Sequence, residues 1–167
     1  MEPVTEWIRH RFPLAENVSP DMVEQWMKEN RERLLLLDVR SPAEYQVSHL
    51  QGAIRVDPET TNMGELVKTL GLEGGGADPA VVCYCTVGFH ASQLAQKLRN
   101  VPGGNTRETL HSSTSIYNLE GGLLKWANDR KALVDSGLQP TRLVHPSTEL
   151  WAQLLRAEFE APGDVAQ

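Results

Sequence analysis

Two short apolar runs constrain the fold of this chain more than any other feature of its sequence. The first, over residues 34–39, begins with four consecutive leucines, and the second, over residues 80–84, reads Ala-Val-Val-Cys-Tyr. Neither run alternates between polar and apolar residues. A strand formed by either would therefore be buried on both faces, as in the centre of a parallel sheet. Shorter strands are indicated over residues 52–56 and 116–119.

Helical patterns separate these strands along the chain. Ser19 is a predicted N-cap with Pro20 at the first helical position, and Ser41 with Pro42 begins a second, shorter helix. Further helical patterns end at Gly71, start near Ala91 and follow Gly121-Gly122. This alternation predicts an α/β domain, with a central, mostly parallel sheet and helices on both of its faces.

Composition and charge exclude several classes of protein. The chain has 167 residues and a formal net charge of -6 without a basic stripe, so we expect one domain and no nucleic-acid partner. No apolar run is long enough to cross a bilayer and the first residues lack a secretory signal, so we expect no membrane partner. Cys83 and Cys85 lie too close along one strand for an ordinary disulfide, which favours a reducing compartment and a cytoplasmic protein.

Cys85 is the strongest candidate for a reactive residue. It directly follows the strand over residues 80–84, and the sites of open α/β sheets lie outside the carboxyl ends of the strands. The helix that follows would direct its free N–H groups and the positive end of its dipole toward this position. Because both favour an anion, we expect the pKa of the Cys85 thiol to be lowered.

The residues after Cys85 are predicted to form an anion-binding loop, and they are Thr86, Val87, Gly88, Phe89, His90 and Ala91. Successive backbone N–H groups of such a loop can hold a thiolate or another anion without acidic or basic side chains. Gly88 would permit a positive φ, so that the loop can wrap around the sulfur. Cys83 is expected to be a buried small hydrophobic residue, with a resolving role toward Cys85 as the alternative.

Three segments together resemble the rhodanese family of sulfurtransferases. They are residues 36–45 continuing to 48–53, the loop 85–90, which is similar to the family's Cys-x-x-Gly-x-Arg loop, and residues 117–122 with Trp126. The resemblance covers roughly residues 19–134. It implies a rhodanese-like fold and a persulfide on Cys85, which takes a sulfane sulfur from a donor such as thiosulfate. The sulfur would pass to cyanide or to another thiol, without a cofactor.

One position departs from the family pattern, because His90 stands where the loop has an arginine. Arginine is always charged and offers forked donors, whereas an imidazole is only partly protonated near neutral pH. Either His90 forms an ion pair with the Cys85 thiolate, or it only fills the position and anion binding is weakened. Asp38 is a supporting candidate that could orient the loop or cap the next turn. Arg40 could supply positive charge or form a surface ion pair with Glu44.

The resemblance divides the chain into an N-terminal extension (1–17), a rhodanese-like domain (18–135) and a C-terminal extension (136–167). The last carries an amphipathic helical pattern formed by Leu150, Trp151, Leu154, Leu155 and Phe159. We expect this helix to pack back onto the domain, with docking of a protein partner as the alternative. The histidines have no ligand-like spacing with the cysteines, so no metal site is predicted.

Three functions compete at this stage. The first is a sulfurtransferase with a small-molecule sulfur donor and a thiol acceptor. The second is a rhodanese-like interaction module that is weakly active or non-catalytic. The third is phosphatase chemistry, which uses a related loop with the arginine one position further from the cysteine. Ala91 occupies that position here, so phosphate would lack a bidentate partner, and this function ranks last.

Overall fold

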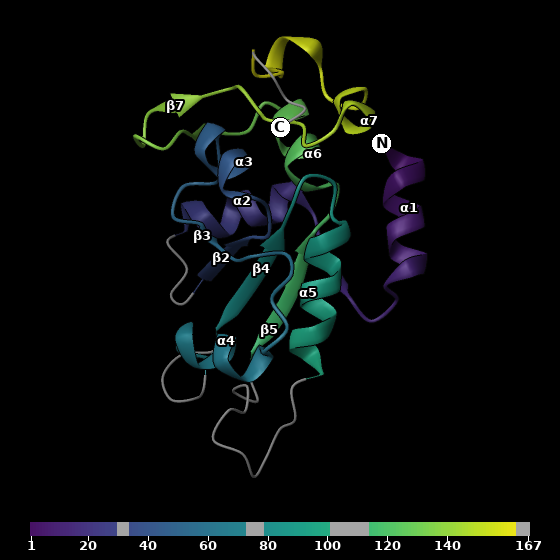
Figure 1. Ribbon diagram of the computed structural model, residues 1–167, viewed down its shortest axis with the longest axis vertical. Coiled ribbons are helices and arrows are strands. Elements are labelled where there is room, and N and C mark those ends of the chain that lie inside the picture. Colours follow the sequence, from purple (N-terminus) through teal and green to yellow (C-terminus); the bar gives the residue numbers. More distant parts are fainter. Residues whose placement is uncertain (30–33, 73–78, 101–113, 163–167) are drawn as a thin grey trace.

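A parallel β-sheet forms the centre of the protein in a computed structural model that describes residues 1–29, 34–72, 79–100 and 114–162 (Figure 1). The described strands of this sheet have the order β1-β5-β4-β2-β3, and every neighbouring pair is parallel. They are β1 (Glu16–Val18), β2 (Leu34–Asp38), β3 (Ile54–Arg55), β4 (Ala80–Tyr84) and β5 (Ser115–Leu119). The predicted α/β fold with a mostly parallel sheet is thus confirmed.

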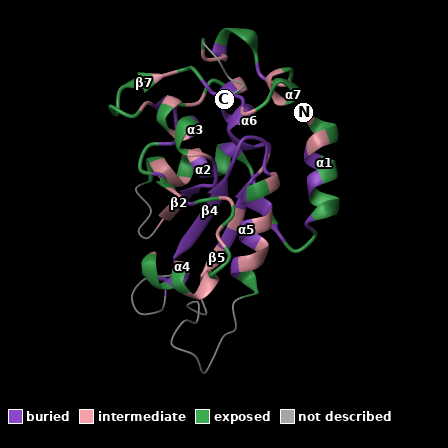
Figure 2. Cartoon of the chain, in the orientation of Figure 1, coloured by how far each residue is buried: buried purple, intermediate pink, exposed green. Residues whose placement is uncertain are grey.

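The central strand β4 is buried along its whole length, which explains its apolar sequence. Figure 2 shows that the buried residues are concentrated in this strand and in the loop that follows it. Asp38, the last residue of β2, is aligned with Tyr84, the last residue of β4. Because the strands are parallel, Asp38 and Cys85 lie at the same edge of the sheet.

Helices cover both faces of the sheet. The helices of the described chain are α1 (Glu2–Arg11), α2 (Pro20–Lys28), α3 (Pro42–Val47), α4 (Met63–Thr69), α5 (Phe89–Arg99), α6 (Gly122–Asn128) and α7 (Glu149–Ala152). Successive side chains of a strand point to opposite faces, and two neighbours on β5 show this arrangement. Asn118 approaches Gly88 at the start of α5, whereas the ring of Tyr117 lies 5.3 Å from that of Trp26 on α2.

The predicted helix starts are confirmed where a capping side chain is present. Ser19 accepts a hydrogen bond from the backbone of Met22, as expected for the N-cap of α2. Ser41 and Glu44 form a reciprocal capping box at the start of α3. Trp126 is buried, whereas Tyr45 is only half-buried.

The C-terminal amphipathic pattern does not form one helix, so this expectation was wrong. Helix α7 ends at Ala152, and a separate 3-10 turn spans Ala157–Phe159. Asn128 of α6 explains the interruption, because its side chain bonds to the carbonyl of Leu154 and the N–H of Arg156. Phe159 is nevertheless buried, so the segment packs back onto the domain. Residues 163–167 of this extension lie outside the described residues.

The N-terminal extension contains structure that the sequence analysis did not anticipate. Helix α1 lies beside α5 (Figure 1), and β1 forms one edge of the central sheet.

A small antiparallel pair, β6 (Leu133–Val134) and β7 (Pro140–Thr141), follows α6. Within the described parts of the chain, no helix has the length and apolar character needed to cross a membrane.

Candidate active site

Cys85 lies in the loop between β4 and α5, where backbone groups surround its sulfur. The residue is only 3% exposed. Its Sγ accepts hydrogen bonds from the N–H of Gly88 at 3.2 Å and from the N–H of Ala91 at 3.4 Å. Gly88 has a φ of +113°, which confirms the expected left-handed turn at this position. The loop thus encloses the sulfur with N–H donors, an arrangement that suits an anion.

Burial has the larger effect on the acidity of this thiol, contrary to the sequence-based expectation. It raises the pKa of Cys85, because a thiolate loses hydration inside the protein. The backbone N–H groups of Ala91, Gly88, His90 and Val87 act in the opposite direction and offset part of this effect. The predicted lowering of the pKa was wrong because the sequence showed the donors but not the enclosure of the sulfur.

The first turn of helix α6 forms hydrogen bonds with the backbone of this loop. The N–H of Leu123 donates to the carbonyl oxygen of Cys85 at 2.9 Å, and the N–H of Leu124 donates to that of Thr86 at 3.1 Å. Gly122 permits this approach, since a Cβ there would lie 2.4 Å from the carbonyl oxygen of Thr86. The sequence indicated only a turn at Gly121-Gly122, and the contact with the loop was missed.

Glu44 is a second residue that sequence reasoning did not assign to the site. The hydroxyl of Thr86 donates to its carboxylate at 3.0 Å, and the hydroxyl of Ser41 donates to the other carboxylate oxygen at 2.9 Å. Glu44 is buried, so these bonds are shielded from water. The capping-box spacing from Ser41 to Glu44 was the available sequence signal, but the partner Thr86 is supplied by the fold.

Asp38 and Arg40 form a buried pair next to this loop. The Arg40 guanidinium donates to both carboxylate oxygens of Asp38, at 2.8 and 2.6 Å, and to the carbonyl oxygen of Ser48 at 2.7 Å. Tyr84, the residue before Cys85, donates its hydroxyl to Asp38 at 2.6 Å. Arg40 therefore pairs with Asp38 and not with Glu44 at the surface. Their supporting role toward Cys85 stays a prediction.

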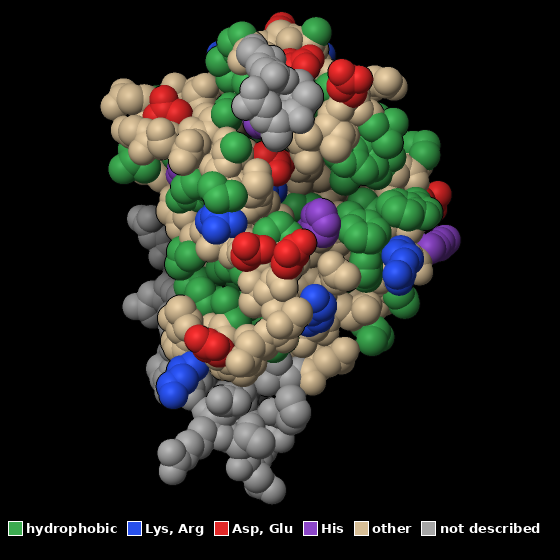
Figure 3. All heavy atoms as spheres, viewed as in Figure 1, with side chains coloured by type: hydrophobic (Ala, Val, Ile, Leu, Met, Phe, Trp, Pro, Cys, Tyr) green, Lys and Arg blue, Asp and Glu red, His purple; other side chains and the backbone are tan. Residues whose placement is uncertain are grey.

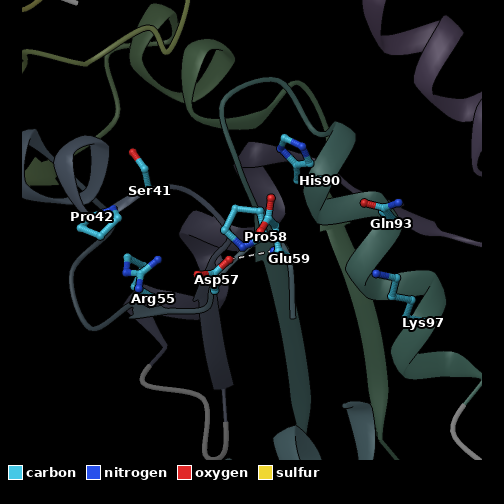
Figure 4. Close-up of a pocket in the computed structure, with 9 residues that line it drawn as sticks. All are labelled: Ser41, Pro42, Arg55, Asp57, Pro58, Glu59, His90, Gln93 and Lys97. Atoms are coloured by element: carbon cyan, nitrogen blue, oxygen red, sulfur yellow. Dashed lines mark hydrogen bonds between the residues drawn. The ribbon is translucent and has the colours of Figure 1, made fainter. Parts of the chain in front are cut away.

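Beside the loop is a hollow of about 580 Å³ that His90 helps to line (Figure 4). His90 is exposed on the first turn of α5, and its ring extends toward this hollow. The remaining lining residues come from α5, from the start of α3, and from β3 with the segment after it. They are Gln93 and Lys97, then Ser41 and Pro42, and finally Arg55, Asp57, Pro58 and Glu59. Figure 3 shows acidic, basic and histidine side chains gathered around it.

Helix α1 covers the opposite flank of the loop. The Trp7 ring stacks on the Phe89 ring at a centroid distance of 5.6 Å, and the Phe12 ring meets Phe89 edge-on at 4.9 Å. A methyl group of Ile8 lies 3.8 Å from the position that a Cβ on Gly88 would occupy. Phe89 and Gly88 are therefore held by a helix that the family-like motifs do not include.

Cys83 lies inside β4, away from the hollow. It is fully buried, and burial raises the pKa of its thiol well above the usual range. Both cysteines are free. The expectation of a buried small hydrophobic residue is confirmed for Cys83.

These observations define a parallel α/β domain with a cysteine in an anion-binding loop at the end of its central strand. The family model described as "Rhodanese-like domain" matches residues 19–129. The chain therefore belongs to the rhodanese-like domain family.

The chain spans about a quarter of the length of the first curated relatives that it matches, and its identity to them is low. The sequence is 29% identical over 110 residues to the Mycobacterium tuberculosis protein named probable adenylyltransferase/sulfurtransferase MoeZ. The match covers 66% of this chain and 24% of that protein. The solved thiosulfate sulfurtransferase from Pseudomonas aeruginosa superposes with a TM-score of 0.58 at 18% identity, over 90% of this chain and 26% of that one. Yeast Ygr203w, a protein tyrosine phosphatase of the rhodanese family, superposes with a TM-score of 0.54 at 21% identity. The match covers 68% of this chain and 85% of that one. These two structures support the fold alone.

Proposed function

We propose that this protein is a sulfurtransferase that carries sulfane sulfur as a persulfide on Cys85. The observation that supports it best is the pair of backbone N–H groups, from Gly88 and Ala91, that donate to the Cys85 sulfur. Such donors stabilise a thiolate and equally a persulfide anion, and neither step of the reaction needs a cofactor. The family relationship to proteins named sulfurtransferases supports the same chemistry.

The reaction has two steps. The Cys85 thiolate attacks the outer sulfur of a donor such as thiosulfate, the donor S–S bond breaks, and sulfite leaves. An acceptor, either a thiolate or cyanide, then attacks the outer sulfur of the persulfide, whose S–S bond breaks to regenerate the Cys85 thiolate. The negative charge on residue 85 is carried by sulfur both as thiolate and as persulfide, and the loop donors lie beside it.

A weakly active interaction module is the second candidate. The burial that encloses Cys85 and raises its pKa favours it, because a neutral enclosed thiol attacks slowly. The replacement of the loop arginine by His90 points the same way. Phosphatase chemistry remains the least favoured function, since Ala91 has no guanidinium group that could donate two hydrogen bonds to a phosphate.

The remaining parts of this proposal concern the setting of the reaction. Two free cysteines suit a reducing compartment, so we place the protein in the cytoplasm. Small-molecule donors and acceptors are its proposed partners, and the net charge of -6 disfavours nucleic acid.

The test is the intact mass of the purified protein before and after treatment with thiosulfate. We expect one added sulfur atom that cyanide removes as thiocyanate. Cys85→Ser should abolish both the mass increase and turnover, whereas Cys83→Ser, the matched control two residues away, should keep most of the activity. A folded Cys83→Ser variant without activity, beside an active Cys85→Ser variant, would refute the assignment of the nucleophile. A wild type that never gains sulfur would favour the interaction module.

A further inference from the structure

The hollow beside His90 contains charges of both signs. Arg55 and Lys97 are half-buried cationic residues, whereas Asp57 and Glu59 are exposed acidic residues. Figure 4 shows the two acidic side chains between Arg55 on one side and Lys97 on the other. No ion pair within the described part of the chain involves any of these four side chains. Arg55 donates a hydrogen bond to the carbonyl oxygen of Arg40, and the Asp57 carboxylate accepts one from the N–H of Glu59. These bonds are to neutral backbone groups, so an opposite charge on a bound molecule could still pair with each side chain.

Two of the residues that line the hollow are connected to the loop after Cys85. His90 contributes its backbone N–H to the donors around the Cys85 sulfur, and its side chain lines the hollow. Ser41 also lines the hollow, and its hydroxyl bonds to Glu44, which in turn accepts the Thr86 hydroxyl. A molecule bound here therefore lies against the loop that carries Cys85.

We propose that this hollow binds the sulfur acceptor and selects a small zwitterionic thiol, such as an amino-acid or short-peptide thiol. This inference rests on the proposed function of Cys85. A carboxylate of the acceptor would lie near Arg55 or Lys97, and its ammonium group near Asp57 and Glu59. A volume of about 580 Å³ is in the range that holds a molecule of this size.

The charge pattern excludes simpler ligands as the best fit. An anion without an ammonium group would be attracted by Lys97 and Arg55 but repelled by the two carboxylates between them. A cation would be attracted by the two carboxylates but repelled by Lys97 and Arg55. A neutral thiol would form an ion pair with none of these side chains. Only a molecule with both charges pairs with both sets of side chains, so selectivity follows from the arrangement and not from the net charge of the hollow.

The step at this site is balanced without an added oxidant or reductant. The thiol of the bound acceptor loses its proton to solvent, and its thiolate attacks the outer sulfur of the Cys85 persulfide. The persulfide S–S bond breaks, a new S–S bond forms on the acceptor, and Cys85 leaves as a thiolate. The product is the acceptor's own persulfide, and the sulfane sulfur keeps its oxidation state.

The test uses protein that is loaded with sulfur beforehand, so that donor chemistry does not enter. Loss of the added sulfur is followed by intact mass with cysteine and glutathione as zwitterionic thiols. The comparison thiols are 3-mercaptopropionate (anionic), 2-aminoethanethiol (cationic) and 2-mercaptoethanol (neutral). After correction for the acidity of each thiol, we expect the zwitterions to react several-fold faster. Rates that follow thiol acidity alone would overturn the inference.

Two substitutions separate the charge contributions. Lys97→Gln should slow the thiols that carry a carboxylate and should not slow 2-aminoethanethiol, whereas Glu59→Gln should slow the thiols that carry an ammonium group. Lys68→Gln, on the exposed side of α4 and outside the hollow, is the matched control and should change none of the rates. Equal effects on all thiols would refute the proposed recognition.

A non-reactive probe distinguishes failure of this inference from failure of the proposed function. S-methylated glutathione cannot accept sulfur, so it should compete with glutathione for the loaded protein and bind the unloaded protein in a calorimetric titration. If no sulfur can be loaded on Cys85, the proposed function fails and the inference falls with it. If loading succeeds but the probe neither binds nor competes, the inference alone is wrong.

Discussion

The backbone of Gly122 lies against the carbonyl group of Thr86, so closely that a Cβ on Gly122 would come within 2.4 Å of the carbonyl oxygen. This contact joins the start of α6 to Thr86, the residue that follows Cys85. It also allows Leu123 to donate its N–H to the carbonyl of Cys85. The glycine pair of the third motif is therefore part of the structure that shapes the active-site loop.

Gly122→Ala should damage both stability and activity. The added methyl group meets backbone atoms, which cannot give way as a flexible side chain can, and the residue has a φ of +62°. We expect a loss of about 2 to 4 kcal/mol in the free energy of unfolding, measured by urea denaturation, together with a large loss of sulfur transfer. Gly71→Ala is the matched control, since φ there is +72° and a Cβ added at Gly71 would meet no atom of the described residues within 4 Å. If Gly122→Ala lowers the free energy of unfolding only as much as Gly71→Ala does, the contact between Gly122 and the Thr86 carbonyl does not contribute to stability.

The alkylation rate of Cys85 should rise only at alkaline pH. Burial raises the pKa of this thiol, so the thiolate forms only above the value of about 8.5 that is usual for a free cysteine. The rate of alkylation by iodoacetamide, measured against pH in the Cys83→Ser background, should have its midpoint above that value. Because the folded pKa is raised, the associated stability is present below the unfolded pKa and is lost as pH rises through the folded pKa. A midpoint below the free value would mean that the loop donors outweigh burial.

His90→Arg should increase the turnover of thiosulfate with cyanide. A guanidinium on the first turn of α5 adds a permanent, forked cation beside the hollow and the loop, and thiosulfate is a dianion. One well-aligned contact of this kind corresponds to a gain of about tenfold or more in kcat/KM. Steady-state kinetics from mildly acidic to mildly alkaline pH should also show a flatter profile for the variant. Equal rates and parallel profiles would mean that residue 90 does not meet the anion.

Trp7→Ala should loosen the catalytic loop from its outer side. The stacked Trp7 ring restrains Phe89, and its removal should cost about 1 kcal/mol and should speed alkylation of Cys85. Trp7→Phe should restore most of the wild-type behaviour, because it keeps an aromatic ring against Phe89. Leu150→Ala, which removes an apolar side chain that is 62% exposed, is the control and should leave the alkylation rate unchanged. Unchanged alkylation in Trp7→Ala would show that α1 does not act on the loop.

The local parts of the fold and site were predictable because their causes lie in short stretches of sequence. The strand over residues 80–84 is apolar on both faces because it is central in a parallel sheet whose two faces are covered, and Ser19 caps α2 through a neighbour three residues away. Cys85 could be placed at the carboxyl end of that strand for the same reason. These features depend on periodicity and capping, which the sequence displays directly.

The contacts that complete the site could not be predicted, because they join distant residues. Glu44 meets Thr86 from 42 positions away, and nothing in either segment indicates the other. The helix expected near the C-terminus is interrupted because Asn128 binds backbone groups of that segment. The pKa of Cys85 was predicted in the wrong direction because burial is set by the whole fold. Helix α1 was missed because its contacts with Phe89 are also tertiary.

The bonds from Leu123 and Leu124 to the carbonyls of Cys85 and Thr86 also set an order of events during synthesis. A ribosome makes the cysteine well before it makes the start of α6, and chains fold as their segments become available. A nascent chain that ends before residue 122 therefore displays a thiol whose loop lacks its supporting helix. The loop of the proposed persulfide site is therefore complete only when translation has passed α6.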